Sequence, residues 1–231
     1  MRRFYPTLAN RPTIANMPRM PTAKICGLTD APALDAALRG GASHVGLVFF
    51  APSPRNLLPE QAAALAQRTP DHVARVGVFV DPDDALLDAA VAAGRLDAVQ
   101  LHRTAPARIA AIRARLQRET WAAVAIRTRA DLDGVRDLAG AADRILYDAK
   151  TPPGAALPGG MGVRFDWDLL DGFRHPLPWL LSGGLDPANV GEAIRRTRAT
   201  LVDVSSGVED APGVKSPARI AAFLHAVAAA S

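Results

Sequence analysis

Cys26 is the only cysteine of this 231-residue chain, and it lies in Lys24-Ile25-Cys26-Gly27, where a short apolar run meets a glycine. A lone thiol cannot form an intrachain disulfide, and no Cys/His spacing indicates a zinc site. The thiol is therefore either a small buried hydrophobic group, the commoner fate of a free cysteine, or a reactive group at the end of a strand. Its neighbours in the fold must decide between the two.

A carboxyl group in a similar position, Asp148, ends the apolar run Ile145-Leu146-Tyr147. A thiol and a carboxyl that face one substrate from opposite sides suit an isomerisation, in which one group removes a proton and another supplies one. Two structural roles stay open for Asp148, because aspartates after strands commonly cap helices and Lys150 is near enough in sequence for an ion pair.

Glycines and serines follow the last two predicted strands, in Ser182-Gly183-Gly184-Leu185 and in Ser205-Ser206-Gly207. Glycines let backbone N–H groups approach a ligand closely, helix N-termini favour anions, and serine hydroxyls add donors. Either loop alone is an ordinary turn, but the pair on adjacent strands predicts a phosphate site. Its candidate residues are Gly183, Gly184, Ser205, Ser206 and Gly207.

The elements that must position these groups alternate between strand-like and helical segments. The predicted strands are 22–26, 44–50, 74–80, 98–101, 121–126, 144–147, 179–181 and 201–204. The predicted helices are 32–39, 57–68, 83–93, 106–118, 130–138, 187–196 and 216–230, with a short one near 166–173. The strands are mostly continuous apolar runs, which is typical of parallel strands buried on both faces.

Eight such units predict an α/β fold, a single-domain (β/α)8 TIM barrel that covers residues 21–231. A doubly wound open sheet is the alternative, but the Gly-x-Gly-x-x-Gly turn that usually begins it is missing. In a barrel of this kind, chemistry is found at the C-terminal ends of the strands, where Cys26, Asp148 and both glycine-serine loops are expected.

Composition limits the possible partners. The chain is 49% hydrophobic with a net charge of +4, which allows one large core and suits an anionic substrate. Aromatic residues make up only 5%, and no basic stripe alternates with them, so we expect no nucleic-acid partner. No run of about 18 apolar residues occurs, so we expect no membrane partner. The single thiol fits a cytoplasmic location.

Residues 1–20 carry four arginines and no acidic residue, and they lack the continuous apolar stretch of a secretory signal. We expect them to form a short disordered N-terminal extension ahead of the barrel.

Taken together, these segments resemble the phosphoribosylanthranilate isomerase family of tryptophan biosynthesis from about residue 22 to the C-terminus. The ordered set carries the resemblance, since any one piece is weak. The pieces are Lys24-Ile25-Cys26-Gly27-Leu28-Thr29, Gly46-Leu47-Val48-Phe49-Phe50, Ser53-Pro54-Arg55, Val76-Gly77-Val78-Phe79, Val99-Gln100-Leu101-His102, Phe165-Asp166-Trp167, Ser182-Gly183-Gly184-Leu185 and Asp203-Val204-Ser205-Ser206-Gly207-Val208-Glu209.

The resemblance implies an Amadori rearrangement of N-(5-phosphoribosyl)anthranilate to 1-(o-carboxyphenylamino)-1-deoxyribulose 5-phosphate, with no cofactor and no metal. It implies that Asp148 is the general acid that protonates the ribose ring oxygen, and that Cys26 is the general base that takes the C2′ proton. Arg55 would bind the anthranilate carboxylate, which its planar fork suits. The partner implied is this small phosphorylated substrate, bound by a monomer or a homodimer.

One loop departs from the family. Gly159-Gly160-Met161-Gly162 stands where the family often has Gly-Gly-Thr-Gly, which puts any polar role of that loop in doubt.

Strand alternation predicts a supporting pair. Lys24 faces the same way as Cys26, and strand eight neighbours strand one in a closed barrel, so we expect Lys24 to pair with Asp203 beneath the site. A buried lysine without a partner would be costly, and its charge could favour the Cys26 thiolate. We expect His102 to be structural, because neither an acid nor a base is lacking.

Three other functions are alternatives to the isomerase that the resemblance implies. A lyase or synthase such as indole-glycerol-phosphate synthase needs lysines, of which only three occur here. A histidine-pathway sugar isomerase would have Asp in place of Cys26. A degenerate, non-catalytic barrel would be expected to lose some of Cys26, Arg55, Asp148 and the phosphate loops.

Overall fold

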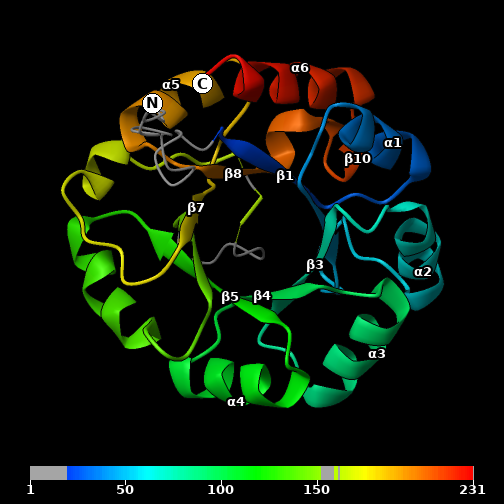
Figure 1. Ribbon diagram of the computed structural model, residues 1–231, viewed down its shortest axis with the longest axis horizontal. Coiled ribbons are helices and arrows are strands. Elements are labelled where there is room, and N and C mark those ends of the chain that lie inside the picture. The colour runs from blue at the N-terminus through cyan, green and yellow to red at the C-terminus, as the bar shows by residue number, and fades with distance from the viewer. Residues whose placement is uncertain (1–19, 152–158, 161, 231) are drawn as a thin grey trace, which may run out of the picture.

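The computed structural model describes residues 20–151, 159–160 and 162–230. The predicted extension at 1–20 therefore lies outside the described residues except for residue 20, and so does Met161. Within the described part, the fold is the predicted barrel: eight parallel strands close on themselves in chain order, and β1 pairs with both β2 and β8. In Figure 1, which looks into the barrel, the helices surround the strands.

The barrel strands are close to the predicted ones. They are β1 Thr22–Cys26, β2 His44–Val48, β3 Ala74–Val80, β4 Ala98–His102, β5 Glu119–Ile126, β6 Arg144–Ala149, β7 Trp179–Leu181 and β8 Leu201–Val204. The α-helices are α1 Ala31–Arg39, α2 Pro59–Arg68, α3 Asp84–Gly94, α4 Pro106–Leu116, α5 Val190–Thr197 and α6 Pro217–Ala228. In Figure 1, α6 lies beside α1, where the ring of helices closes.

Three predicted helices differ from the observed elements for local reasons. The segment at 130–138 is a 3-10 helix, η2 Arg129–Leu138, whose Gly134 weakens α-helix formation. The short helix near 166–173 is only η3 Trp167–Leu170. α5 starts three residues later than predicted, because the Asp186 carboxylate accepts the N–H groups of Ala188 and Asn189 and holds a turn there.

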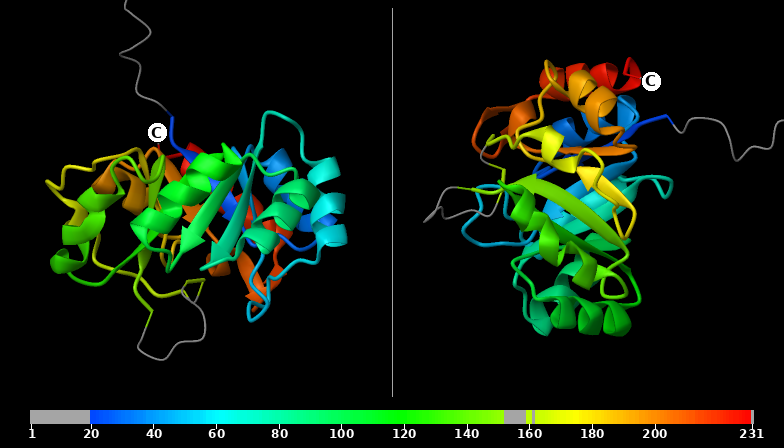
Figure 2. Two further views of the ribbon diagram at one scale, coloured as in Figure 1. Left: turned by 90° about the horizontal axis from the view of Figure 1, so that it is seen from below. Right: turned by 90° about the vertical axis from the view of Figure 1, so that its left-hand side faces the viewer.

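The loop after β8 holds elements that the sequence analysis missed. A short 3-10 turn, η4 Ser206–Val208, leads into an antiparallel hairpin of β9 Glu209–Ala211 and β10 Val214–Lys215. The two side views of Figure 2 show this segment, in orange, projecting from one end of the barrel. The hairpin therefore belongs to the rim on which the candidate site lies.

The barrel interior changes from apolar to polar along its axis. One layer near the N-terminal ends of the strands is apolar and buried: Val76, Ala98, Trp121, Leu146, Leu180 and Leu201. Two residues further along their strands lie buried Gln100 and Asp203, and Lys24 pairs in register with Asp203.

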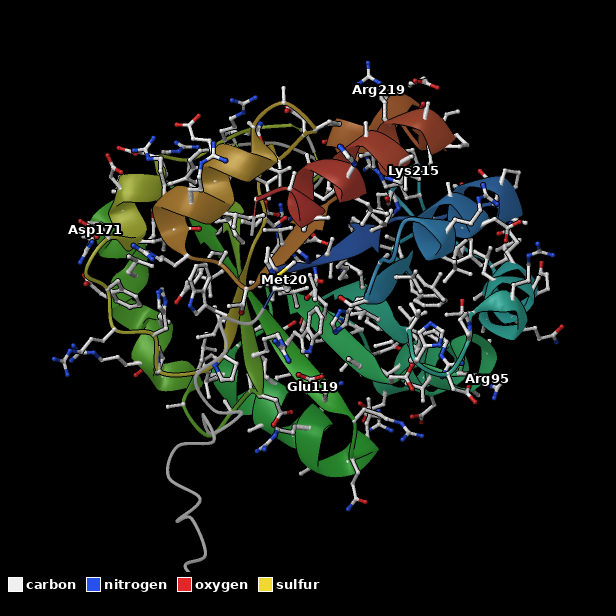
Figure 3. All side chains as sticks on the ribbon, turned by 45° about the horizontal axis from the view of Figure 1, so that its top comes forward. Met20, Arg95, Glu119, Asp171, Lys215 and Arg219 are labelled. Atoms are coloured by element: carbon white, nitrogen blue, oxygen red, sulfur yellow. The ribbon has the colours of Figure 1, made fainter. Side chains whose placement is uncertain are left out.

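Exposed charges such as Arg95, Asp171 and Arg219 lie at the periphery in Figure 3. No helix of the described residues is long and apolar enough to cross a membrane.

Candidate active site

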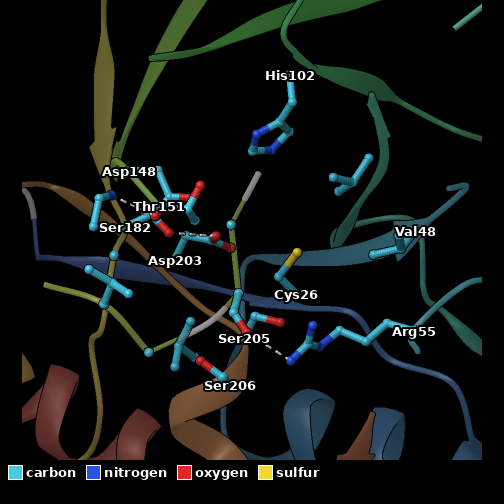
Figure 4. A pocket seen from close by; sticks show the side chains of 18 of the residues that line it. Cys26, Val48, Arg55, His102, Asp148, Thr151, Ser182, Asp203, Ser205 and Ser206 are labelled. Carbon is cyan, nitrogen blue, oxygen red and sulfur yellow. Dashed lines mark hydrogen bonds between the residues drawn. The ribbon is translucent and has the colours of Figure 1, made fainter. Parts of the chain in front are cut away.

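A pocket opens at the C-terminal end of the barrel. Its walls come from the ends of β1, β2, β3, β4 and β6 and from the loops that follow β7 and β8 (Figure 4). The structure brings nine of the predicted site residues to this one pocket. They are Cys26, Arg55, His102, Asp148, Gly183, Gly184, Asp203, Ser205 and Ser206.

Cys26 ends β1 with its side chain toward the pocket, and only 6% of the residue is exposed. Its register partner on β2 is Gly46, where a Cβ atom would lie 2.8 Å from the thiol sulfur. The glycine therefore makes room for the thiol. Burial raises the pKa of Cys26, and Asp203 raises it too, whereas Lys24 and Lys215 lower it. Lys24 thus acts in the expected direction, but it does not by itself make the thiol a thiolate.

The predicted pair beneath the thiol is confirmed. Lys24 Nζ lies 2.8 Å from Asp203 Oδ1, and the lysine side chain is fully buried. Ser182 Oγ donates to the second carboxylate oxygen of Asp203 at 3.2 Å. Both carboxylate oxygens are therefore occupied, and the pair forms a fixed polar layer below the pocket.

Asp148 is 7% exposed, and its Oδ1 accepts the N–H of Ala149 at 2.8 Å. Burial, with the charge of Asp203 as a second cause, raises the pKa of Asp148 to about 7. A carboxyl with this pKa carries a proton in much of the population at neutral pH, as a general acid must. The alternative ion pair with Lys150 is wrong, because Lys150 Nζ bonds to Asp131 at 2.7 Å.

His102 lies on the pocket wall above Gln100, with Gln100 Nε2 and His102 Nε2 2.8 Å apart. Burial, reinforced by the positive charges of Lys24 and Arg103, lowers the pKa of His102 to about 4. The imidazole is therefore neutral at physiological pH. Its structural role stays a prediction.

Arg55 is held more tightly than its predicted role requires. Its Nε and Nη2 donate to the two carboxylate oxygens of Glu209 at 2.6 and 2.7 Å, and Nη2 also donates to the Gly160 carbonyl at 3.1 Å. Glu209 in turn bonds to Lys215. No role for Glu209 or Lys215 was predicted from the sequence, although Glu209 ends the motif Asp203-Val204-Ser205-Ser206-Gly207-Val208-Glu209, which was the available signal.

The predicted phosphate loops meet at one side of the pocket. Gly183 and Gly184 have φ values of +89° and +62°, a left-handed conformation that favours glycine. Ser205 and Ser206 also line the pocket, but Gly207 does not. A Cβ at Gly207 would collide with the Leu185 carbonyl oxygen, so this glycine lets the two loops pack together. Its direct contact with the phosphate stays a prediction.

A further arginine at this wall escaped the sequence analysis. Arg164 Nε donates to the Gly184 carbonyl at 3.1 Å, and its Nη2 pairs with Asp186 at 2.8 Å. It thus braces the loop after β7.

Among the described residues, no group of three His, Cys, Asp or Glu side chains could hold a metal ion.

Comparisons with known proteins agree with this geometry. Residues 23–226 match the family described as N-(5'phosphoribosyl)anthranilate (PRA) isomerase. The chain is 52% identical over 204 residues to the N-(5'-phosphoribosyl)anthranilate isomerase of Paramagnetospirillum magneticum, covering 88% of this chain and 95% of that protein. The corresponding protein of Paracoccus denitrificans is 54% identical over 88% of this chain and 95% of its own length.

Solved structures give the same result. The phosphoribosyl anthranilate isomerase of Thermotoga maritima superimposes with a TM-score of 0.80 at 36% identity, covering 90% of this chain and 98% of that one. A phosphoribosyl anthranilate isomerase in complex with reduced 1-(o-carboxyphenylamino)-1-deoxyribulose 5-phosphate has a TM-score of 0.78 at 33% identity, with the same coverage.

Proposed function

This chain belongs to the N-(5'-phosphoribosyl)anthranilate isomerase family and isomerises N-(5'-phosphoribosyl)anthranilate in tryptophan biosynthesis; we propose that Cys26 and Asp148 are its general base and general acid. One observation carries this assignment. A carboxyl group with a pKa raised to about 7 shares a pocket with the only thiol of the chain, beside two loops suited to phosphate.

The reaction begins at the ribose ring. Protonated Asp148 donates its proton to the ring oxygen as the bond from C1′ to that oxygen breaks, which leaves an iminium between C1′ and the anthranilate nitrogen. Cys26 as thiolate then takes the C2′ proton, and the C2′–H electron pair neutralises the iminium to form an enolamine. The enolamine tautomerises to the ketone, so the overall change is an isomerisation.

The raised pKa of Cys26 keeps the fraction of thiolate low in the free enzyme. The positive charge of the iminium raises that fraction once the ring has opened. A positive charge near a thiol favours its ionised form, so ring opening promotes the proton transfer that follows it. Lys24 adds its charge from below, where Asp203 holds it in place. Asp148 acts first, and its action prepares the base.

The remaining pocket residues recognise the two anionic groups of the substrate. The Gly183-Gly184 turn offers backbone N–H groups, and Ser205 and Ser206 offer hydroxyls, to the phosphate. Arg55 presents its guanidinium to the anthranilate carboxylate. The lysine chemistry of the synthase alternative gains no support, because all three lysines pair with carboxylates: Lys24 with Asp203, Lys150 with Asp131 and Lys215 with Glu209.

We further propose that residues 21–231 act as one catalytic domain in the cytoplasm. A monomer and a homodimer both stay predictions, as does the role of residues 1–20.

One assay tests the proposed function. The substrate is generated from anthranilate and phosphoribosyl pyrophosphate, and loss of its fluorescence is followed with and without the protein. We expect loss well above the spontaneous rate. A rate equal to the spontaneous one would contradict the isomerase function.

A further inference from the structure

Hairpin β9–β10 lies outside the barrel sheet, yet it carries two buried charged side chains. Its register places Glu209 opposite Lys215, and these residues are only 8% and 4% exposed. Their hairpin neighbours Asp210 and Val214 are exposed. In Figure 3, Lys215 lies farther inside the outline of the molecule than the exposed α6 residue Arg219. Charged side chains are rarely buried this deeply unless they are paired.

Lys215 uses all its hydrogen-bonding capacity. Its Nζ donates to Glu209 Oε1 at 2.7 Å, to the Ser205 carbonyl at 2.9 Å and to Ser205 Oγ at 3.3 Å. An ammonium group has three donors and no acceptor, so Ser205 Oγ must accept here. The hydroxyl hydrogen of Ser205 is then free to donate into the pocket. That orientation suits an anionic oxygen of a phosphate.

Glu209 fixes the plane of Arg55. The carboxylate takes Nε and Nη2 of the guanidinium in a bidentate pair, a geometry that sets orientation as well as energy. Nη2 also bonds to the Gly160 carbonyl, whereas Nη1 makes no hydrogen bond to the described residues. The Nη1 edge is therefore the part of Arg55 left for a ligand carboxylate.

The hairpin is itself tied to the loop that carries Arg55. Gly213, in the hairpin turn, has a φ of +81°, and a Cβ there would lie 2.7 Å from the Pro54 carbonyl oxygen. On the other side, a Cβ at Gly27 would lie 2.5 Å from Arg55 Cδ and 3.3 Å from Ser205 Oγ. Gly213 therefore ties the hairpin turn to the loop that carries Arg55, and Gly27 confines the side chains of Arg55 and Ser205.

The charges in this group do not cancel. Burial alone would raise the pKa of Glu209, but the hydrogen bond from Arg55 and the charge of Lys215 outweigh it and hold that pKa below its usual value. Glu209 is therefore ionised at neutral pH and sits between two cations. Burial lowers the pKa of Lys215, and the charge of Glu209 opposes that shift. With Lys215 protonated, the buried group of three carries one surplus positive charge, which complements an anionic ligand.

We propose that Glu209 and Lys215 are positioning residues that act together: Glu209 orients Arg55 for the substrate carboxylate, and Lys215 orients the Ser205 hydroxyl for the substrate phosphate. This inference rests on the proposed function and extends it to specificity. One short hairpin sets the relative placement of two anion-binding groups, so the site selects a substrate that carries both anions at a fixed separation.

The first test replaces the charge of Glu209 and keeps its shape. In E209Q, the amide NH2 group of the glutamine faces an N–H group of Arg55, and neither group can accept a hydrogen bond. The orientation of the Arg55 guanidinium is then no longer fixed. We expect KM to rise about 10- to 100-fold, while kcat changes by less than about threefold, since a hydrogen bond to a charged group has this scale. The control is D210N, which makes the same chemical change at the exposed neighbouring position and should leave both constants within about twofold.

A double-mutant cycle separates positioning from general stability. In an R55A background, E209Q should raise KM by less than about twofold, because Glu209 acts through Arg55. A loss of equal size in both backgrounds would overturn the proposed role of Glu209. So would an unchanged KM in E209Q alone.

The second test uses inorganic phosphate as a competitive inhibitor. K215M should raise the inhibition constant of phosphate about tenfold, because the Ser205 hydroxyl loses the donor that orients it. An unchanged constant in K215M would overturn the role of Lys215. Failure of the proposed function is distinguishable, because the wild-type protein would then show no isomerase activity from which to measure these effects.

Discussion

Asp148 and Cys26 titrate in an order that shapes how the enzyme responds to pH. The pKa of Asp148 is raised to about 7, and burial raises the pKa of Cys26 above its ordinary 9.0. Enzyme that carries one proton on this pair exists in two forms, and the active form, with Asp148 protonated and Cys26 ionised, is the less populated one. The ratio of the two forms does not change with pH, so activity is proportional to the total amount of this singly protonated enzyme.

This order predicts the direction of the pH profile. Singly protonated enzyme accumulates as pH rises through about 7 and disappears only above the raised pKa of Cys26, so kcat/KM should rise through about pH 7 to an alkaline plateau. The measurement is kcat/KM from about pH 5.5 to about 9.5 at constant ionic strength. The residual activity of D148N serves as control and should lack the limb near 7. A wild-type profile that falls through pH 7 would rule out this pair of protonation states.

In strand β2, the glycine at position 46 makes room for the catalytic thiol because it has no side chain. Gly46 lies beside Cys26 in register, and a Cβ there would meet Cys26 Sγ at 2.8 Å. Real Cβ atoms do not approach this closely, so the thiol must move. Since a general base must lie within hydrogen-bond reach of its proton, even a small displacement is costly.

We therefore expect G46A to lower kcat at least about tenfold, with a smaller change in KM. The matched control is G134A in η2, where an added Cβ has nothing within 4 Å and φ is not positive. Steady-state kinetics of both variants check this prediction. Equal activity of G46A and wild type would show that the thiol does not need its present position.

Hairpin β9–β10 could not be predicted from the sequence, whereas the barrel strands could. The eight barrel strands were predictable because most of them are largely apolar runs, and their order fixed which ends carry Cys26 and Asp148. β9 and β10 are only three and two residues long and carry buried charges, so no apolar pattern marks them. The Lys24–Asp203 pair was predictable, because it follows from side-chain alternation on adjacent strands.

For the whole molecule, the site carries a cost in stability. The pKa of Asp148 is raised on folding from 3.8 to about 7, so the unfolded chain loses this proton at a lower pH than the folded chain. The stability contributed by protonated Asp148 is fully present below about pH 4 and is lost as pH rises through about 7. This pKa difference corresponds to about 4 kcal/mol at most.

D148N should therefore be more stable than wild type at about pH 8, with a melting temperature several degrees higher, and should match it at about pH 4. The asparagine keeps an oxygen that can accept the Ala149 N–H, so the local hydrogen bond survives. Thermal unfolding of both proteins at the two pH values checks this. A D148N protein that is less stable than wild type at pH 8 would contradict the raised pKa.

What the sequence could not predict for the whole molecule is how burial shifts protonation. The positions of Cys26, Asp148 and His102 at strand ends were apparent, but their pKa values depend on how completely the assembled barrel excludes water. The same holds for Arg55, whose partner Glu209 lies 154 positions away and meets it only in the folded chain.

The decisive measurement of whether Cys26 and Asp148 carry the proton transfers is kcat of C26A and D148N, followed by substrate fluorescence. Each substitution should lower kcat at least about 10²-fold, the usual scale for one general acid or base, and change KM by less than about threefold. A C26A enzyme with near-normal kcat would contradict this assignment and leave the thiol as a buried hydrophobic group.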